Sequence, residues 1–449
     1  MPESGTRPQQ IVIIGGGASG TLAAIHLARA AGERPLQLTV IEPGRLGEGI
    51  AYSTRDPQHR LNVPAVGMSA HPDDPEHFLR WVRARGDADF PAGGFAPRRD
   101  YGKYLVETLS DALDEAPTVD FEHVRTRAEN LVPAGAGWRV DLAGGIFATA
   151  DAIVLALGSG VPATAWAPPG LLASSLFVAD PWAAKVTDDD VPGRGGTVLI
   201  VGAGLSMADL AMSWGRSGAT VHVVSRHGLL PLAHAADPGP KPSAPDLPDD
   251  ESLDLAGLRR FVVEQIRAAD DWRGGVDSLR PVTQQLWAKI PLEDQIRFLR
   301  TDNRRWGRIR HRVAPQVGAW LDEAFTGGRL VNHEGTVAEA RETAGRIEVR
   351  LTGGEKVIAD VVVNCTGPAN DPAHGTEPLL HALLDTGIVR AHPVGIGLDV
   401  DVDGVPRAAM NLPPIITLGP PRQGELWEST AIPEIRVQAA ALPEQLLRD

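Results

Sequence analysis

Two glycine-rich segments have the spacing that lets backbone amides bind a pyrophosphate. In the first, residues 15–20 read GGGASG after the apolar run 11–14. Gly15 is expected to form a tight turn, Gly17 to admit the pyrophosphate, and Gly20 to let a helix pack closely on the strand. That helix, with Ser19 in its first turn, would direct free N–H groups at the phosphates. Glu42 follows the apolar run 38–41 and is placed to accept hydrogen bonds from a ribose. The segment therefore predicts a dinucleotide site.

The second segment, residues 202–207, reads GAGLSM after the apolar run 198–201. Gly202, Gly204 and Ser206 are its phosphate-binding candidates. Met207 stands where a third small residue is expected, so either helix and strand lie farther apart or Ala208 makes the close contact. Two dinucleotides in one chain imply electron transfer between them.

Arg226 follows the next strand, where an NAD site would carry an acid. A guanidinium suits the 2′-phosphate of NADP and cannot accept a hydrogen bond from the free ribose of NAD. The sequence therefore favours NADPH over NADH. The alternative is that Arg226 is only a solvated cation at a strand end.

Composition excludes several classes of protein. The 449 residues are 43% hydrophobic, which is enough for two or three domains with buried cores. A net charge of −14 argues against nucleic-acid binding. The first ten residues are polar and no window approaches 18 apolar residues, so we expect a soluble cytoplasmic protein without membrane contact. No cluster of Cys, His or acidic residues has metal-ligand spacing, so no metal is expected.

Cys365 is the only cysteine, so the chain cannot form an internal disulfide. Flavoproteins that reduce disulfides through a redox-active cysteine pair are thereby excluded. Cys365 itself is expected to be a small buried hydrophobe at a strand end.

The order of apolar runs predicts an α/β fold with two Rossmann-like dinucleotide-binding domains, the second nested within the first. The first domain is expected to comprise residues 1–192 and 368–449, and the second residues 193–367. A helical insertion is expected over about 235–325. Hairpins are predicted at 137–147 and 337–351. Three further strands end at glycines that could face a cofactor: Gly158, Gly367 and Gly419.

Arginines crowd one part of the insertion, where they accompany Trp306 and His311. Guanidinium groups suit carboxylates and phosphates, so this stretch could bind an anionic substrate or the phosphates of NADP. Arg310 and Arg312 are the candidates for the catalytic site. The alternative is a solvated helix face paired with surface acids. The arginines are Arg297, Arg300, Arg304, Arg305, Arg308, Arg310 and Arg312.

The two glycine-rich segments, the strands that end at Gly158 and Gly367, and the nested second domain resemble the class B flavoprotein monooxygenases. The chain is more closely similar to a bacterial family of NAD(P)/FAD-binding proteins. That resemblance covers nearly the whole chain and is carried by residues 49–53, 59–65, 180–182, 271–273, 310–315 and 427–436.

The resemblance implies FAD in the first site and a nicotinamide in the second. It also implies that residues 62–69 lie along the isoalloxazine ring, which makes Asn62, Val63 and Met68 cofactor candidates. Asn62 is in addition a catalytic candidate that could hydrogen bond the ring or the nicotinamide amide, although an Asx turn before Pro64 explains it equally well.

A helix within 425–440, with Pro433 in its first turn and Ser429 or Thr430 as its cap, would point its N-terminus at the pyrimidine edge of a flavin. Thr430 is therefore a further cofactor candidate. The alternative is an ordinary C-terminal helix.

In class B monooxygenases NADPH reduces FAD, and the reduced flavin uses molecular oxygen to oxidise a nitrogen, a sulfur or a carbonyl carbon. The motif FxGxxxHxxxW/D of Baeyer–Villiger enzymes is absent between the two glycine-rich segments. N-hydroxylation or S-oxidation of a small anionic or amine-bearing substrate is therefore the expected reaction. The alternatives are an NADPH-dependent flavin reductase or dehydrogenase, and a flavin-binding redox-sensing module.

Overall fold

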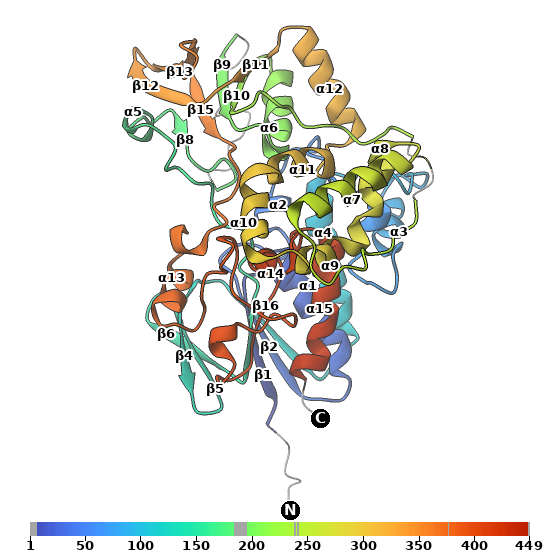
Figure 1. Ribbon diagram of the computed structural model, residues 1–449. Coiled ribbons are helices and arrows are strands. Elements are labelled where there is room, and N and C mark those ends of the chain that lie inside the picture. Colours follow the sequence, from blue (N-terminus) through green and yellow to red (C-terminus); the bar gives the residue numbers. More distant parts are fainter. Residues whose placement is uncertain (1–6, 184–194, 238, 240–241, 376, 448–449) are drawn as a thin grey trace, which may run out of the picture.

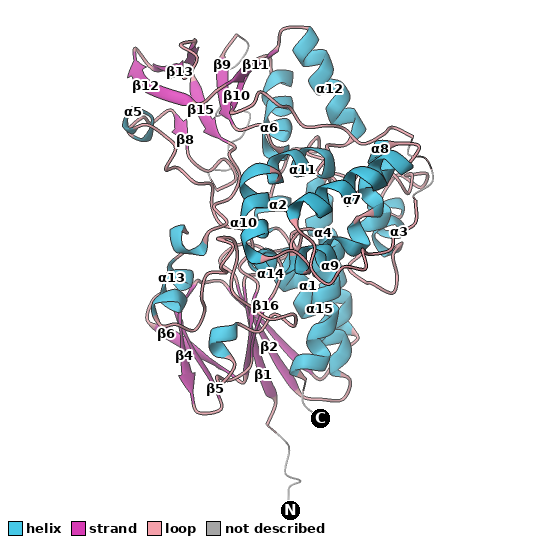
Figure 2. Ribbon diagram, in the orientation of Figure 1, coloured by secondary structure: helices cyan, strands magenta, loops and turns pink. Residues whose placement is uncertain are grey.

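The computed structural model describes residues 7–183, 195–237, 239, 242–375 and 377–447. Two five-stranded parallel sheets lie at opposite ends of the molecule, and helices occupy the space between them (Figures 1 and 2). This is the expected α/β fold with two Rossmann-like units.

The first sheet has the order β16-β7-β1-β2-β3. Its central strand, β1 (Gln9–Ile14), is apolar on both faces because helices cover one face and a second sheet covers the other. The other strands are β2 (Leu36–Ile41), β3 (Val119–Val124), β7 (Ala152–Leu155) and β16 (Ile415–Thr417).

Three helices pack on one face of this sheet: α1 (Ala18–Ala31), α4 (Arg98–Asp114) and α15 (Ile432–Leu446). An antiparallel sheet and the helix α13 (Pro378–Asp385) cover the other face. This small sheet contains the expected hairpin, and its strands are β4 (Ala128–Ala134), β5 (Gly137–Leu142) and β6 (Ile146–Ala150). The short helices α2 (Gly49–Tyr52), α3 (His77–Arg83) and α14 (Gln423–Leu426) lie in connections.

The second sheet has the order β11-β10-β9-β15-β8. Its strands are β8 (Phe177–Val178), β9 (Thr197–Val201), β10 (Thr220–Ser225), β11 (Leu330–Glu334) and β15 (Val361–Asn364). The helices α6 (Leu205–Arg216) and α12 (Pro315–Thr326) cover one face. The short helix α5 (Pro169–Leu172) and a second antiparallel sheet cover the other face. That sheet contains β12 (Val337–Thr343), β13 (Arg346–Leu351) and β14 (Lys356–Ala359).

Two boundaries differ from those expected from the sequence. The strand β8 pairs with β15, so the chain enters the second domain before residue 177 rather than at 193. The helix α12 packs on α6 in the second core, so it belongs to the second domain and the insertion ends before it. Both elements were misplaced because strand pairing and helix packing across many residues leave no local signal.

In its described residues, the insertion proper contains five α-helices, which lie between the two sheets in Figure 1. Most of these helices share a small core with Trp427 of the return segment, so the insertion docks on the first domain although it interrupts the second. The helices are α7 (Leu255–Ala268), α8 (Trp272–Ser278), α9 (Thr283–Ala288), α10 (Leu292–Thr301) and α11 (Asn303–Arg310). Among the described residues, no helix is both long and apolar enough to cross a membrane.

Candidate functional site

The first glycine turn has the geometry that a pyrophosphate cradle requires. Gly15 has φ +100°, and a Cβ there would lie 2.3 Å from the carbonyl oxygen of Ala156. A Cβ at Gly20 would lie 1.8 Å from the carbonyl oxygen of Gly15, so only glycine allows α1 to approach β1 this closely. Gly17 is the N-cap of α1 and faces Gly49. A substituent at Gly17 would therefore enter the space in front of the N-terminus of the helix.

The second glycine turn repeats the first only in part. Gly202 has φ +108°, and a Cβ there would lie 2.2 Å from the carbonyl oxygen of Cys365. Gly204 is the N-cap of α6, with open space where its Cβ would be. Met207, at the third position, is fully buried in the second core. The side chain of Met207 therefore stands at the position that Gly20 takes in the first glycine turn.

A cavity of about 2250 Å³ connects the two domains. Its volume exceeds the roughly 300–1,000 Å³ of ordinary ligand pockets, which leaves room for a dinucleotide and a second molecule. Residues from the first glycine turn form one wall, and the α6 face that carries Leu210 and Trp214 forms another. The expected cofactor residues that line the cavity are Gly15, Gly17, Ser19, Glu42, Gly158, Ser206, Gly367 and Thr430.

The other expected cofactor residues lie outside this lining. Gly419 packs against Ser19, because a Cβ at Gly419 would lie 2.6 Å from the serine oxygen. Met68 is buried in the first core with 2% of its surface exposed. The backbone oxygen of Asn62 accepts a hydrogen bond from Nε2 of His234 at 3.1 Å, and neither Asn62 nor Val63 is among the lining residues. The segment 51–57, together with His59, lines the cavity instead.

Glu42 lies at the end of β2, as expected for an acid that binds a ribose. Its carboxylate accepts hydrogen bonds from the backbone N–H of Gly16 at 2.9 Å and of Gly44 at 2.8 Å. These bonds hold the carboxylate beside the glycine turn, at the cavity wall.

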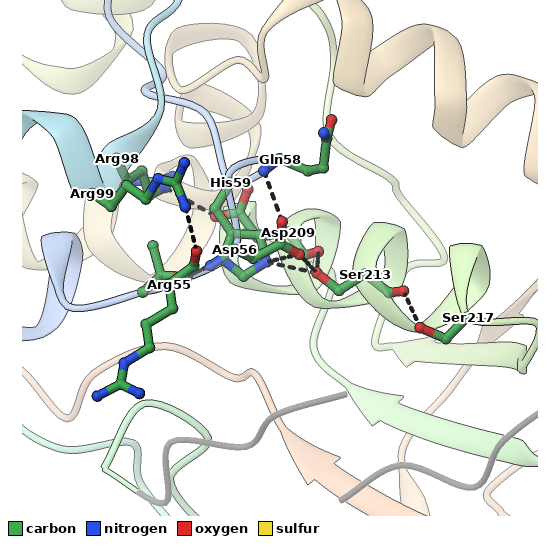
Figure 3. A network of polar contacts seen from close by, with 10 residues as sticks. Arg55, Asp56, Gln58, His59, Arg98, Arg99, Asp209, Ser213 and Ser217 are labelled. Carbon is green, nitrogen blue, oxygen red and sulfur yellow. Dashed lines mark hydrogen bonds and ion pairs between the residues drawn. The ribbon is translucent and has the colours of Figure 1, made fainter. Parts of the chain in front are cut away.

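A polar network joins the loop 54–59 of the first domain to α6 of the second (Figure 3). The hydroxyl of Ser213 donates to the carboxylate of Asp56, so Nε2 of His59 must donate to Ser213 Oγ, which lies 2.8 Å away. Nδ1 of the same ring lies 2.7 Å from Thr54 Oγ1, within hydrogen-bonding distance. Trp182 packs edge-on against the same imidazole, with ring centroids 5.9 Å apart. The imidazole of His59 is therefore held by groups from both domains.

A buried ion pair lies beside this network. Nε of Arg98, at the start of α4, donates to Oδ2 of Asp209 on α6 at 3.0 Å, with side-chain exposures of 15% and 6%. Burial raises the pKa of Asp209, and the charge of Arg98 opposes that shift. The two domains are thus fastened at this point by directional contacts, since each polar partner would be left unpaired if they separated.

Polar atoms without partners mark the carboxyl end of β10. Oγ of Ser225 and Nε of Arg304 are both buried, and neither makes a hydrogen bond within the described residues. Burial lowers the pKa of Arg304, and the nearby charge of Arg226 lowers it further. Arg226 and Arg304 are close enough for their charges to repel, and an anion such as a phosphate would relieve that repulsion.

The two arginines expected at the catalytic site form ion pairs with carboxylates of the protein. Nε of Arg310 donates to Oε2 of Glu428 at 2.9 Å, with side-chain exposures of 10% and 7%. Arg312 is completely buried and pairs with Asp277 at 2.5 Å. Neither is a lining residue of the cavity. Their contacts are those of structural residues and give no support to a role in holding an anionic substrate.

The helix expected near the C-terminus begins later than its proposed cap. Ala431 is the N-cap of α15, while Ser429 Oγ donates to the carbonyl oxygen of Gly419 at 3.2 Å. Thr430 and Ile432 line the cavity, so the N-terminus of α15 lies at its wall. The prediction that Ser429 or Thr430 caps this helix is wrong. The sequence cannot show that the Ser429 hydroxyl bonds to the carbonyl oxygen of Gly419 instead.

Several residues of this site carry too weak a local signal to be found in the sequence. Asp56, His59 and Ser213 are ordinary polar residues until the fold joins two segments 154 residues apart. Ser225 could have been selected because it precedes Arg226 at a strand end. In the sequence, nothing distinguishes Arg304 from the other arginines of the insertion.

The sequence profile of the FAD-NAD(P)-binding family matches residues 12–160. No curated protein sequence matches the chain. Among solved structures, ornithine hydroxylase from Pseudomonas aeruginosa has a TM-score of 0.64 at 17% identity, over 98% of this chain and 99% of its own. The cadaverine monooxygenase of Erwinia amylovora has a TM-score of 0.65 at 14% identity, over 99% and 95%. Bacillithiol disulfide reductase from Bacillus cereus has a TM-score of 0.56 at 16% identity, over 98% of each chain.

These likenesses concern the fold. Residues 12–160 form an FAD-NAD(P)-binding domain, and the whole chain has the architecture of FAD- and NAD(P)-dependent oxidoreductases. An ornithine hydroxylase, a cadaverine monooxygenase and a bacillithiol disulfide reductase all share that architecture.

Proposed function

We propose that this protein is an FAD- and NADPH-dependent monooxygenase that N-hydroxylates or S-oxidises a small substrate. The observation that carries the proposal is the cavity that the first glycine turn and Ser206 of α6 both border, because it gives a flavin and a second ligand access to one another. When bound, FAD would supply the hydride-accepting and oxygen-activating chemistry.

The first glycine turn fits FAD. Gly15 and Gly17 would leave the pyrophosphate in contact with backbone N–H groups, while Ser19 and the N-terminus of α1 would stabilise its charge. Glu42 would hold the adenosine ribose. Gly158, Gly367 and Thr430 would border the rest of the cofactor, and the dipole of α15 would stabilise negative charge at that end.

The carboxyl end of β10 fits the 2′-phosphate of NADPH. Arg226 and Arg304 would both donate to it, and Ser225 would supply a hydroxyl. Gly202, Gly204 and Ser206 would contact the pyrophosphate at the N-terminus of α6. NAD lacks the phosphate and would leave the repulsion between the two guanidinium groups uncompensated.

The single cysteine supports the oxygenase over a disulfide reductase. Cys365 is buried, and its burial raises the pKa of the thiol far above the ordinary range. Exchange with a disulfide requires an accessible thiolate. The ornithine and cadaverine enzymes that share the fold act on small amines, which makes amine-bearing substrates the first class to test.

The proposal is tested with purified protein, FAD, NADPH and oxygen against a panel of amines, amino acids and thioethers. We expect at least one compound to accelerate NADPH consumption and to yield a hydroxylamine or sulfoxide in matching amount. Consumption that yields only hydrogen peroxide with every compound would indicate a flavin reductase or dehydrogenase. An absence of NADPH oxidation would favour the redox-sensing alternative.

A further inference from the structure

The helix α11 has two polar faces that contact different domains. Successive residues of an α-helix are rotated by about 100°, so residues 304 and 308 share one face while 306 and 310 share another, about 200° away. Arg308 donates to the carbonyl oxygen of Leu230 at 2.9 Å, and Arg304 lies near Arg226. Trp306 and Arg310 both donate to Glu428 of the first domain, at 2.6 and 2.9 Å. The helix therefore bridges the end of β10 and the return segment.

The backbone of the return segment is strained where α11 contacts it. Trp427 has φ 27° and Glu428 has φ 57°, a region that residues with side chains rarely adopt. Such a conformation persists only when the surroundings hold it. Trp427 is 6% exposed and stacks on Trp287 of α9, with ring centroids 4.9 Å apart. The carboxylate of Glu428 is held by Trp306 and Arg310 alone among the described residues.

The strained turn leads directly into the cavity wall. Ser429 follows it and is bonded to Gly419, which in turn packs against Ser19 of the first glycine turn. Thr430 and Ile432 then line the cavity. A second contact from the insertion, the paired bonds of Arg280 to Glu434 at 2.6 and 2.8 Å, holds the first turn of α15. A shift of α11 would thus move the wall against which a flavin would lie.

We infer that α11 couples the two dinucleotide sites: an anion bound between Arg226 and Arg304 fixes the helix, and Trp306 and Arg310 transmit its position through Glu428 to the wall of the flavin cavity. The inference rests on the proposed function, since the anion is the 2′-phosphate of NADPH. Arg310 and Trp306 are on this view positioning residues that touch neither cofactor.

The test uses adenosine 2′,5′-bisphosphate, which carries the 2′-phosphate and lacks the nicotinamide that would contact the flavin. It is added to the FAD-loaded protein, its binding is measured by calorimetry, and the visible absorbance and fluorescence of the flavin are recorded. We expect saturation to change the flavin spectrum. Adenosine 5′-monophosphate, which has no 2′-phosphate, should bind at least about fivefold more weakly.

Two variants separate transmission from binding. Trp306→Phe keeps an aromatic ring but removes the N–H that donates to Glu428, together with part of the indole, and Glu428→Gln removes the charge that Arg310 holds. Both should retain the affinity for adenosine 2′,5′-bisphosphate within about threefold while losing most of the spectral response. Arg300→Gln, which changes an exposed arginine on the neighbouring helix α10, is the control and should behave as the wild type. Trp306→Phe is the conservative change if Glu428→Gln does not fold.

The outcomes distinguish a failure of the coupling from a failure of the proposed function. Binding without a spectral change in the wild type, or an undiminished change in Trp306→Phe, would overturn the coupling and leave the NADPH assignment in place. An absence of binding would remove the 2′-phosphate site, and the coupling with it.

Discussion

Oγ of Ser213 lies 2.8 Å from Nε2 of His59, although 154 residues separate them in the sequence. The contact joins α6 of the second domain to the loop 54–59 of the first at the wall of the cavity. Hydrogen bonds at the cavity wall therefore help to fix the orientation of the two domains.

Replacing Ser213 with Ala should loosen the loop 54–59. Asp56 and His59 would each lose a partner, and an unsatisfied buried polar group costs about 1–3 kcal/mol. We expect hydrogen–deuterium exchange of peptides that cover residues 54–59 to be faster, with little change in the core of the first sheet. Ser217→Ala is the control, because its hydroxyl bonds only to its own helix, at 3.2 Å from Ser213 O. Equal protection in both variants would show that the loop is held by other contacts.

Replacing Gly17 with Val should abolish flavin binding, because the added side chain would occupy the space in front of α1 and meet the backbone of Gly49. The wild type should be yellow and release FAD on denaturation, and the variant should be colourless. Gly93→Val adds the same side chain at an exposed loop glycine with open space around it, and should stay yellow. Undiminished FAD in Gly17→Val, or release of FMN from the wild type, would contradict the assignment.

Replacing Arg226 with Ala should raise the KM for NADPH about 10- to 100-fold, because a charge-assisted hydrogen bond contributes about 1.5–3 kcal/mol. The KM for NADH should hardly change. Steady-state reduction with both nucleotides measures the ratio, and Arg341→Ala, at an exposed site on β12, is the control. A wild type that prefers NADH, or a variant that treats both nucleotides as before, would make Arg226 a solvated cation.

Stability should fall as the solution is acidified through pH 6.5 toward 4. Burial, followed by the charge of Arg29, lowers the pKa of His71 from 6.5 to about 4. Between these pH values the imidazole of His71 is protonated in the unfolded chain but not in the folded chain. The stabilisation present above pH 6.5 is therefore lost as the pH falls. We expect the thermal midpoint to drop across this window and the drop to be smaller in His71→Asn.

The exposed His374 provides the control for this pH dependence. His374→Asn makes the same change at a histidine whose side chain is 80% exposed, and this variant should keep the slope of the wild type. A slope that is the same in all three proteins would locate the acid sensitivity elsewhere, for example at His234, whose burial also lowers its pKa to about 4.

Local patterns were sufficient to predict the two glycine turns and the strands that precede them. A Rossmann turn is built from adjacent residues, so the same spacing that fixes the backbone of Gly15 and Gly202 is visible in the sequence. The nested order of the domains was also predictable, since it follows from the order of apolar runs. The hairpins at β5–β6 and β12–β13 and the strand β15 occur where periodicity placed them.

Only the tertiary structure decided which polar residues meet. Arg310 was indistinguishable in sequence from a substrate-binding arginine, and its role depends on Glu428, which is 118 residues away. The same holds for Ser213 with His59 and for Arg304 with Arg226. Arginine, serine and histidine have no periodicity that reveals their partners, because a hydrogen bond or ion pair between domains depends on how whole sheets and helices pack. The sequence by itself therefore determined the two glycine turns, and the packing between the domains determined what lies around them.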